Sequence, residues 1–373
     1  MNIRSYTSVA NRRKALEKEL RVDLGHVGSF TLDESVASSR NCENMIGAAQ
    51  IPMGVAGPLR IGNRKYYFPL ATTEGALVAS VSRGCKAITE SGGALVDSHR
   101  VGATRGPVFK VKDLKESDKL YKFLQRNLET LNAIAKKTSR HIKLVKLLTR
   151  GVGKYRYVRF VFDTQDAMGM NMVTLASDAL AGYIEKETGV TCIALAGNFD
   201  IDKKAAWLNF IENRGIKVWA EVTISGKTLR NVLKTTAQKM YEVWLAKCMI
   251  GSAMAGSTGF NAQFANVIAA IFLATGQDAG HIGESSIGIT TAEIIDGNNL
   301  YMNVVLPDLM VGTVGGGTGL ATQKEALSIV GAKTSQEFAE VVAGAVLAGE
   351  ISLLASLSEG TLARAHERYG RNR

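Results

Sequence analysis

Cysteines, histidines and prolines are few in this chain, and their scarcity excludes several classes of protein. The four cysteines lie far apart among 373 residues, without a CxxC or mixed Cys/His spacing. Disulfide frameworks and structural zinc sites both need closely and regularly spaced cysteines, so we expect buried thiols instead. The five histidines form no HxxxH or HExxH pattern, which disfavours a metal enzyme. We therefore predict no metal centre.

Long apolar runs are also missing. The run at 342–357 is interrupted by Glu350, and the run after Asn266 stops at Gly276. Because about 20 apolar residues are needed to span a bilayer, neither run predicts a membrane helix. Residues 1–20 have the spacing of an amphipathic helix and lack the apolar core of a signal peptide. These absences predict a cytoplasmic protein without a membrane partner.

Positive charge is concentrated in one segment of a globular chain. Hydrophobic residues make up 46% of the sequence, enough for two or three domains of roughly 100–200 residues. Residues 110–159 contain 15 lysines and arginines but only four acidic residues, a surplus of 11 that equals the net charge of the whole chain. This surplus favours an anionic partner, either nucleic acid or the phosphates of a nucleotide or coenzyme. For residues 112–137 alone, a solvated lysine-rich helix face is an equally good interpretation.

The segment before this basic region shows four local patterns. Residues 9–21 have helical spacing, and 41–59 combine two of the five prolines with three glycines, which indicates an ordered but irregular segment. Residues 65–71 have the pattern of a strand, and the small and apolar residues after Glu74 indicate a buried helix. A glutamate at a helix start usually caps the helix or interacts with its dipole, so one of these two roles is the favoured interpretation of Glu74 alone.

The basic region belongs to a unit with its own order of elements. The pattern predicts strand, helix, strand, strand, helix and strand, at 107–112, 115–137, 141–150, 154–164, about 168–187 and 191–196. This order is typical of the split βαβ, ferredoxin-like unit. We expect a helical segment at 1–40, a large domain formed by 41–106 and 195–373, and an inserted ferredoxin-like domain at 107–194. The expected fold class is therefore α+β, with a buried central helix in the large domain; the absence of GxGxxG after a first strand argues against a Rossmann domain.

Beyond the insert, residues 251–286 form the most distinctive stretch. Apolar residues at 267–274 predict a helix without a solvent-exposed face, and the chain turns polar at Asp278, His281 and Glu284. Because an isolated buried charge is too costly, a carboxylate at the end of such a helix is either paired or catalytic. Both interpretations are equally favoured at this point. The other elements expected here are a long helix at 226–247, a strand near 298–312 and two final helices at 322–330 and 336–357.

Further polar side chains are candidates for chemistry. Lys203 and Lys204 follow Asp202, and a lysine beside a carboxylate keeps its proton and polarises a carbonyl oxygen. The alternative is an ordinary surface turn. Asp166 suits the N-cap of a helix whose free amides hold a phosphate, although a capped helix with a methionine-rich buried face explains it equally well. His366 is a lone imidazole on an arginine-rich tail, and it is either an acid for a leaving group or a surface residue.

Eleven short motifs occur in one order over residues 41–366. They are ENMIG, IPMGVAGPL, TTEGALVAS, RGCKAI, TRGPV, DAMGMNM, DKK, GSAMAG, GFNAQFAN, GQDAGH and GTVGGGT. Together they resemble 3-hydroxy-3-methylglutaryl-coenzyme A reductase in its class I, archaeal-type form without a membrane anchor. The resemblance implies reduction of the thioester to mevalonate and free coenzyme A by two NADPH, in isoprenoid synthesis. It also implies a homodimer with the active site between the subunits and a cofactor bound by the ferredoxin-like insert.

The catalytic groups implied by this resemblance match residues already singled out. Lys203 matches the cation that meets the negative oxygen, and Asp278 matches the carboxylate that bonds to this lysine. Glu74 matches the proton donor in aldehyde reduction. His366 matches the histidine that protonates the departing coenzyme A thiolate. The resemblance thus implies one catalytic site from four positions that are far apart in the sequence.

Binding residues are implied by the same motifs. The substrate positions are Arg105, Asp202, Lys204 and Lys247 with Asn266 nearby, for the hydroxymethylglutaryl group, and Arg83, Lys86 and Lys234, for the coenzyme A phosphates. The cofactor positions are Asp163, Asp166, Ala167, Met168, Gly169, Met170, Asn171, Gly315, Gly316, Gly317 and Thr318.

Several positions depart from the family pattern. Ala196 replaces a serine, which removes one hydroxyl contact to the substrate, and Gln263 replaces a histidine and Ile282 an asparagine. Asp163 stands where animal members carry an arginine for the 2′-phosphate of the cofactor. An aspartate repels that phosphate and favours NADH, whereas the basic insert favours NADPH. We expect NADPH, with NADH as the alternative.

An RNA-binding protein is the competing interpretation. The insert has the strand order of an RNA-recognition module, a positive surplus, and four aromatic residues on its central hairpin: Tyr155, Tyr157, Phe160 and Phe162. However, KYRYVRFVF lacks the glycines of the RNP1 pattern, and the insert is a minor part of the chain. We therefore expect no nucleic-acid partner.

Overall fold

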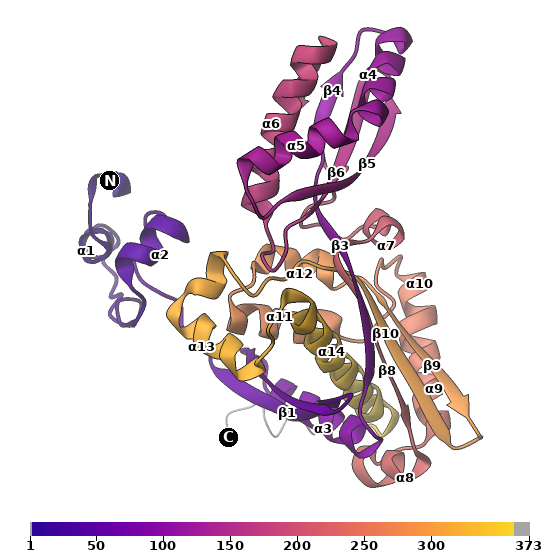
Figure 1. Ribbon diagram of the computed structural model, residues 1–373. Coiled ribbons are helices and arrows are strands. Elements are labelled where there is room, and N and C mark those ends of the chain that lie inside the picture. The colour runs from indigo at the N-terminus through magenta and orange to yellow at the C-terminus, as the bar shows by residue number, and fades with distance from the viewer. Residues whose placement is uncertain (1, 362–373) are drawn as a thin grey trace.

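The computed structural model describes residues 2–361, which form a large body with a smaller module attached to it (Figure 1). The strands are β1 (Met53–Ile61), β2 (Arg64–Ala71), β3 (Leu95–Arg105), β4 (Val108–Lys110), β5 (Lys143–Val152), β6 (Tyr155–Asp163), β7 (Thr191–Ala194), β8 (Arg214–Ile224), β9 (Ile289–Ile295) and β10 (Asn299–Leu309). The α-helices are α1 (Val9–Leu20), α2 (Glu34–Arg40), α3 (Leu77–Glu90), α4 (Leu114–Arg126), α5 (Leu128–Thr138), α6 (Met170–Thr188), α7 (Trp207–Glu212), α8 (Gly226–Thr228), α9 (Ala237–Trp244), α10 (Ser252–Met254), α11 (Phe264–Thr275), α12 (Ile282–Ser285), α13 (Ala321–Val330) and α14 (Ser335–Ser358). Shorter 3-10 or π-helical segments are η1 (Ile3–Ser5), η2 (Leu229–Leu233), η3 (Leu245–Gly251), η4 (Ala279–His281) and η5 (Gly316–Gly319).

An antiparallel sheet in the order β3-β8-β10-β9 forms one side of the body. The sequence of β8 explains its place in the sheet. Its alternate residues Ile216, Val218, Ala220, Val222 and Ile224 are buried, whereas the residues between them are at least partly exposed. A period of two gives the strand one apolar face, and that face packs on the core.

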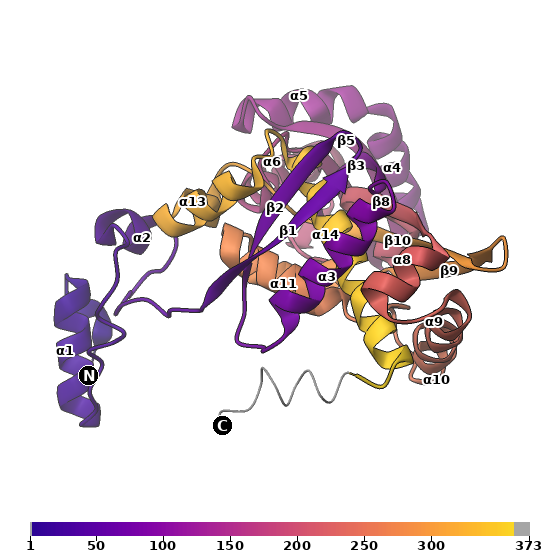
Figure 2. The same cartoon turned by 90° about the horizontal axis from the view of Figure 1, so that it is seen from below.

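The centre of the body is α14, a helix of 24 residues that lies between this sheet and α3 (Figure 1, Figure 2). Glycine and alanine let it approach its neighbours closely. A Cβ added to Gly84 of α3 would lie 1.9 Å from the carbonyl oxygen of Ala348 in α14, so the two helix backbones touch. The helix expected at 267–274 is confirmed as α11, which packs beside α14, but it is not buried on every side, because Leu273 is 37% exposed. The longer of the two helices is α14.

By length and apolar composition, α14 is the one described helix that is able to cross a bilayer, which corrects our expectation that every apolar run is too short. Its most apolar window is 78% buried inside the protein. Glu350, in the middle of the helix, is fully buried and accepts hydrogen bonds from the backbone N–H groups of Ala262 and Gln263 at 2.8 and 2.6 Å. Within this fold, α14 is thus a core helix with an internally satisfied carboxylate.

The smaller module contains β4 to β7 with α4, α5 and α6, and it projects from the body at the end of β3 (Figure 1). Its strands lie in the order β7-β4-β6-β5, and all neighbours are antiparallel. Strand β3 joins the two parts, because its residues 95–102 pair with β8 and its residues 103–105 pair with β6. The module has an apolar core of its own, in which Phe109, Phe160 and Phe162 are fully buried.

Three local predictions are wrong. Residues 115–137 lie in two helices, α4 and α5, which meet at Asn127. The segment at 41–59 is irregular only as far as Pro52, because β1 then pairs with β2. The helix expected at 226–247 is interrupted at Lys234, whose φ of 63° ends η2. Strands β3, β8 and β9 are absent from the prediction.

Only two of the four cysteines are buried, although we expected buried thiols at all four positions. Cys85 and Cys248 are buried, whereas Cys192 is partly exposed and Cys42 is exposed, and no disulfide joins them. Burial raises the pKa of both Cys85 and Cys248 to about 12, so these two thiols stay protonated at neutral pH.

Candidate active site

The module and the body enclose a cleft of about 710 Å3. Its lining residues are Arg40, Asn41, Arg105, residues 167–172, Asp202, Lys203, residues 276–278, Gly312, Val314 and residues 315–318. The cleft therefore joins the end of α2, the start of α6, the turn before α7, the end of α11 and the glycine-rich loop before α13. Most of the predicted cofactor positions and two of the predicted catalytic residues meet here.

Lys203 and Asp278 form an ion pair at the wall of this cleft. Nζ of Lys203 lies 2.7 Å from Oδ2 of Asp278, and the two side chains are 43% and 37% exposed. Asp278 also accepts a hydrogen bond from the backbone N–H of Gly280 at 2.9 Å, which fixes the carboxylate at the start of η4. Burial alone would raise the pKa of Asp278, but the hydrogen bonds from Lys203 and Gly280 outweigh it and hold that pKa below its ordinary value. The carboxylate is therefore ionised at neutral pH and holds the ammonium group.

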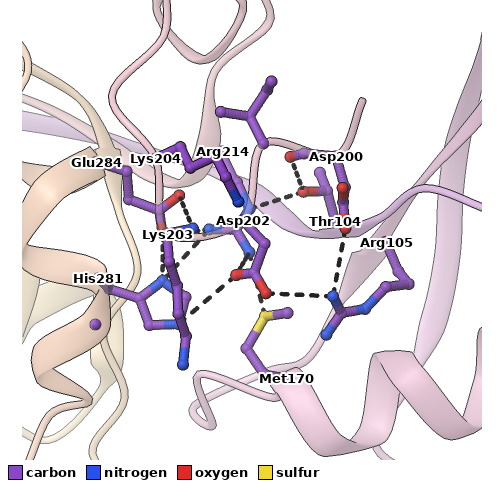
Figure 3. A network of polar contacts seen from close by, with 12 residues as sticks. Thr104, Arg105, Met170, Asp200, Asp202, Lys203, Lys204, Arg214, His281 and Glu284 are labelled. Atoms are coloured by element: carbon purple, nitrogen blue, oxygen red, sulfur yellow. Dashed lines mark hydrogen bonds and ion pairs between the residues drawn. The ribbon is translucent and has the colours of Figure 1, made fainter. Parts of the chain in front are cut away.

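Asp202 links the turn that carries Lys203 to two arginines (Figure 3). Its Oδ1 accepts a hydrogen bond from Arg214 at 2.9 Å, and its Oδ2 accepts one from Arg105 at 3.2 Å. Arg105 also donates to Thr174 of α6 at 2.9 Å. These contacts tie the turn to both the body and the module, and they thereby fix the direction in which Lys203 points.

A buried group of charged side chains lies behind Asp202. Arg214 donates to Glu284, and Nδ1 of His281 contacts the same carboxylate oxygen (Figure 3). Burial raises the pKa of Glu284 to about 7 against the opposing effect of Arg214. Burial and the charge of Arg214 lower the pKa of His281 to about 4, so the imidazole is neutral at neutral pH.

Asp202, His281 and Glu284 are the one cluster among residues 2–361 with metal-ligand chemistry, because their ligand atoms lie within 4.8 Å of one another. Arg214, however, donates to both carboxylates. A guanidinium group therefore already supplies positive charge beside both carboxylates that would have to hold a metal ion. The cluster does not favour a metal ion, and the absence of a metal centre stays a prediction.

Glycines give the cleft backbone surfaces that fit a phosphate-bearing ligand. No side chain in the described part of the chain caps α6, which begins directly after Gly169, so its first amides are available to an anion. Gly315 and Gly316 have positive φ, and a Cβ at either position would meet nothing within 4 Å. A Cβ on Gly276 would lie 2.3 Å from the carbonyl oxygen of Gly317, so the two cleft segments touch backbone to backbone. The two predicted cofactor loops thus share a cleft suited to a nucleotide.

Two of the predicted cofactor residues lie outside the cleft lining. The expectation that Asp166 caps α6 is wrong: its carboxylate accepts a hydrogen bond from the backbone N–H of Ser335 at 2.8 Å, at the start of α14. Asp163 lies 3.9 Å from the guanidinium group of Arg100, which also lies 3.5 Å from Asp166. The negative charge at Asp163 is therefore partly balanced by a neighbour.

Glu74 and Asn266 lie in a second pocket of about 340 Å3, which shares no lining residue with the cleft. Nδ2 of Asn266 donates to Oε2 of Glu74 at 2.9 Å. Glu74 precedes α3 and makes no capping hydrogen bond to it, so the capping interpretation of this residue is wrong, whereas an interaction with the helix dipole stays a prediction. The chain brings Lys203 and Asp278 together without placing Glu74 in their cleft. His366 lies outside the described residues.

The remaining predicted substrate residues do not line the cleft. Arg83 donates to the hydroxyl groups of Ser352 and Ser356 and so ties α3 to α14; burial lowers the pKa of its guanidinium group. The lysines have other surroundings: Lys86 pairs with Glu90, Lys204 donates to Asn198, Lys234 ends η2, and Lys247 lies within η3. Two of the residues that depart from the family pattern serve packing, because Gln263 donates to the carbonyl of Gly349 at 2.6 Å and Ile282 packs on the apolar core.

Sequence reasoning missed Arg40, Gln277 and Arg214 as parts of the site. Gln277 exchanges two hydrogen bonds with the backbone of Gly312, at 2.9 and 3.0 Å, and so holds the glycine-rich loop against the end of α11. The GQD motif, in which Gln277 directly precedes Asp278, is the sequence feature that points to Gln277. Arg214 starts β8, and the alternation of this strand places it on the same face as the buried Ile216, but this strand is absent from the sequence-based prediction.

The aromatic residues of the module do not form an RNA-binding face. Base stacking needs exposed aromatic rings, but Phe160 and Phe162 are fully buried and Tyr157 is half-buried. Of the four rings on this hairpin, Tyr155 alone is exposed.

The chain is similar to known proteins over nearly its whole length. The model of the hydroxymethylglutaryl-coenzyme A reductase family matches residues 8–371. The chain is 50% identical over 372 residues to the 3-hydroxy-3-methylglutaryl-coenzyme A reductase of Methanothermobacter thermautotrophicus, which covers 98% of this chain and 94% of that protein. It is 45% identical over 377 residues to the enzyme of the same name from Halobacterium salinarum, with coverage of 98% and 93%.

The fold is shared with a solved structure. The class II 3-hydroxy-3-methylglutaryl-CoA reductase from Streptococcus pneumoniae, bound to NADPH, aligns with a TM-score of 0.72 at 19% identity, over 95% of this chain and 99% of that one. None of these comparisons supports the RNA-binding interpretation. From the family match and the identity to archaeal relatives over nearly its whole length, the chain belongs to the hydroxymethylglutaryl-coenzyme A reductase family.

Proposed function

We propose that this chain reduces 3-hydroxy-3-methylglutaryl-coenzyme A to mevalonate and free coenzyme A with two NADPH, as a class I member of its family. The observation that carries the proposal is the 2.7 Å pair of Lys203 and Asp278 in a cleft with two phosphate-compatible loops. The archaeal relatives favour the class I form. The reaction belongs to the mevalonate route of isoprenoid synthesis.

Lys203 supplies the positive charge that reduction of a carbonyl group requires. Bound NADPH provides the hydride. The ammonium group of Lys203 stabilises the oxygen that becomes negative and, in the reduction of the thioester, gives it a proton. Asp278 orients the ammonium group before the reaction, so little reorganisation is needed when charge develops.

Arg105 and Asp202 are the proposed contacts of the hydroxymethylglutaryl group. Both line the cleft, and their mutual hydrogen bond holds them beside Lys203. Arg105 suits the carboxylate of the substrate, and Asp202 suits its 3-hydroxyl group, because a guanidinium donates and a carboxylate accepts. His366 is proposed as the acid for the coenzyme A thiolate.

A homodimer is proposed because one chain leaves its site incomplete. Glu74 is exposed and lies in a pocket separate from the cleft, although the family resemblance assigns it a proton-donating role. We infer that the partner subunit brings its own Glu74 pocket to the cleft.

The order β7-β4-β6-β5 supports a ferredoxin-like insert at 107–194 within a large domain of 41–106 and 195–373, after a helical segment at 1–40. The proposed enzyme acts in the cytoplasm and uses no metal.

The choice between NADPH and NADH is tested at Asp163. Replacing Asp163 with Arg should raise the NADPH-to-NADH ratio of kcat/KM about tenfold, roughly 1.4 kcal/mol, because a positive charge near the 2′-phosphate replaces a negative one. Asp163→Asn is the matched control, and removal of the charge alone should give a smaller change in the same direction. An unchanged ratio in both variants would show that Asp163 faces away from the cofactor.

The proposed reaction is tested with the purified full chain. Nicotinamide absorbance is followed with the coenzyme A thioester and each nicotinamide separately, and released thiol is measured in parallel. We expect thioester-dependent oxidation of two nicotinamides for each coenzyme A released, faster with NADPH than with NADH. If neither cofactor is oxidised in a thioester-dependent manner, the proposed function is wrong.

A further inference from the structure

His281 is fully buried beside Glu284 and Asp202 (Figure 3), and one of its two ring nitrogens lacks a hydrogen-bond partner among the described residues. Nδ1 contacts Oε1 of Glu284. Nε2 is fully buried and has no hydrogen-bond partner among the described residues. It lies 3.7 Å from Oδ2 of Asp278 and 3.9 Å from Oδ1 of Asp202, within about 1 Å of hydrogen-bonding range. The ring thus spans the space between Glu284 and the two carboxylates of the site.

The second carboxylate oxygen of Glu284 faces the turn that carries the reacting lysine. Oε2 accepts a hydrogen bond from the backbone N–H of Lys203 at 3.2 Å. Since Nζ of Lys203 bonds to Asp278, the contacts form a chain from Glu284 through His281 and Asp278 to the ammonium group. The charged groups that face His281 from the surrounding segments are Glu284, Arg214, Asp202, Asp278, Lys203 and Asp308.

The neighbours of His281 leave the ring with a single proton. Arg214 lies 3.5 Å from Nδ1, so a second positive charge on the imidazole is unfavourable. One proton is shared between Glu284 and Nδ1 of His281. If Glu284 carries it, the single proton of the ring is on Nε2 and points at the carboxylates of Asp278 and Asp202. If Nδ1 carries it, Glu284 is ionised and Nε2 has no proton. Moving one proton from Glu284 to Nδ1 therefore releases one proton from Nε2.

We propose that Glu284 and His281 hold one proton in reserve and pass it through Asp278 to Lys203 between the two reductions. His281 is a positioning residue in this scheme, because it acts through Asp278 and does not touch the substrate. The inference rests on the proposed reductase function and adds a role for side chains that the resemblance leaves unassigned.

The proton balance of the relay is simple. When the substrate oxygen takes a proton from Lys203, an N–H bond breaks, an O–H bond forms, and a neutral amine remains beside Asp278. The carboxyl group of Glu284 then gives its proton to Nδ1, Nε2 gives its proton to Asp278, and Asp278 gives one to the amine. The lysine is charged again and Glu284 is ionised. Solvent reloads the chain through Asp278, whose side chain is 37% exposed.

The environment of the two buried groups suits this transfer. Burial raises the pKa of Glu284 to about 7, so its carboxyl group both gives and takes a proton near neutral pH. The pKa of His281, lowered by burial to about 4, keeps the ring neutral before and after the transfer.

The first test replaces His281 with Gln in the full-length enzyme. Glutamine keeps polar atoms at this place but does not pass a proton from one to the other. With the thioester we expect kcat at least about tenfold lower and KM within about twofold, since a positioned proton-transfer group contributes roughly 10²–10⁴ in rate. With mevaldehyde the loss should be smaller, because its single reduction begins with Lys203 already charged and takes its proton from Glu74. His99→Gln is the matched control, since His99 is 63% exposed on β3 and lies beside Asp97.

The second test is the pH profile, which a merely structural role would not move. Wild-type kcat for the thioester should fall as pH rises through about 7, where Glu284 loses its proton. Both His281→Gln and Glu284→Gln should remove this inflection and leave a lower, flatter profile.

Two results would overturn the relay: a wild-type profile without an inflection near neutral pH, or a folded His281→Gln enzyme with the wild-type rate and inflection. The wild-type profile decides the question even if the variants fail to fold. An enzyme that oxidises no nicotinamide with the thioester refutes the proposed function itself, whereas an active enzyme without the inflection refutes the relay alone.

Discussion

At the scale of single residues, the two carboxylates Asp278 and Glu284 differ in state although they are six positions apart. Asp278 is half-exposed and bonded to Lys203, and these contacts keep it ionised. Glu284 is fully buried beside Arg214, and burial brings its pKa to about 7. Two acids whose surroundings give them different pKa values are typical of sites that transfer protons.

Replacing Asp278 with Asn should lower kcat for the thioester about 100-fold or more with little change in KM, because the amide lacks the charge that orients the Lys203 ammonium group. Steady-state kinetics at neutral pH measure both constants. Asp97→Asn serves as the control, since Asp97 is 75% exposed at the far end of β3. A kcat within twofold of wild type would mean that the ion pair serves stability alone.

Asp308 predicts an effect of pH on stability. Neither of its buried carboxylate oxygens has a hydrogen-bond partner among residues 2–361, and burial with the nearby Glu284 raises its pKa well above the ordinary value. Such a group contributes stability that is complete below the unfolded-state pKa and is lost as pH rises through the folded-state pKa. Asp308→Asn should therefore raise Tm more at mildly alkaline than at mildly acidic pH. Equal shifts in calorimetric scans at both values would show that Asp308 does not titrate.

At the scale of elements, the contact between α3 and α14 orders the body. The backbones touch at Gly84, and Arg83 on the same helix donates to two serines of α14. Helix α3 thus contacts α14 both through close backbone packing at Gly84 and through the hydrogen bonds of Arg83. Glu74 precedes this helix, so the packing of α3 also sets the position of the second pocket.

Replacing Gly84 with Ala should lower the free energy of unfolding by about 2 kcal/mol or more, because the new methyl group overlaps the α14 backbone. Gly182→Ala is the matched control: Gly182 is an exposed helical glycine of α6 with no atom within 4 Å of an added Cβ. It should raise the same free energy by roughly 0.5–1 kcal/mol through helix propensity. Urea denaturation measures both, and similar values for the two variants would contradict the backbone contact.

At the scale of the whole molecule, the cleft exists because β3 continues from the body sheet into the module. That continuity places the start of α6 opposite the glycine-rich loop of the body. Glu74 remains in its own pocket, and the proposed homodimer accounts for this separation.

A mixing experiment tests the shared site. Glu74→Gln and Lys203→Ala homodimers should each be nearly inactive, but exchange of subunits should restore about a quarter of wild-type activity, because half of the random dimers contain one intact site. Light scattering before and after mixing gives the oligomer size. Mixed activity no higher than that of either variant alone would place Glu74 and Lys203 in sites of the same subunit.

The sequence by itself determined the local motifs that carry chemistry, the order of strands in the module and the family to which the chain belongs. These properties depend on residues that are close in sequence: DKK and GQDAGH name their candidate groups without a fold. The family resemblance already implied the pairing of Lys203 with Asp278, but tertiary structure alone decided that Arg214 is buried between two carboxylates and that Glu74 stands apart. The reason is physical, since burial and charge pairing depend on neighbours that arrive from distant parts of the chain. Burial by such distant segments also raises the pKa of Glu284 to about 7, so this carboxyl group exchanges its proton near neutral pH.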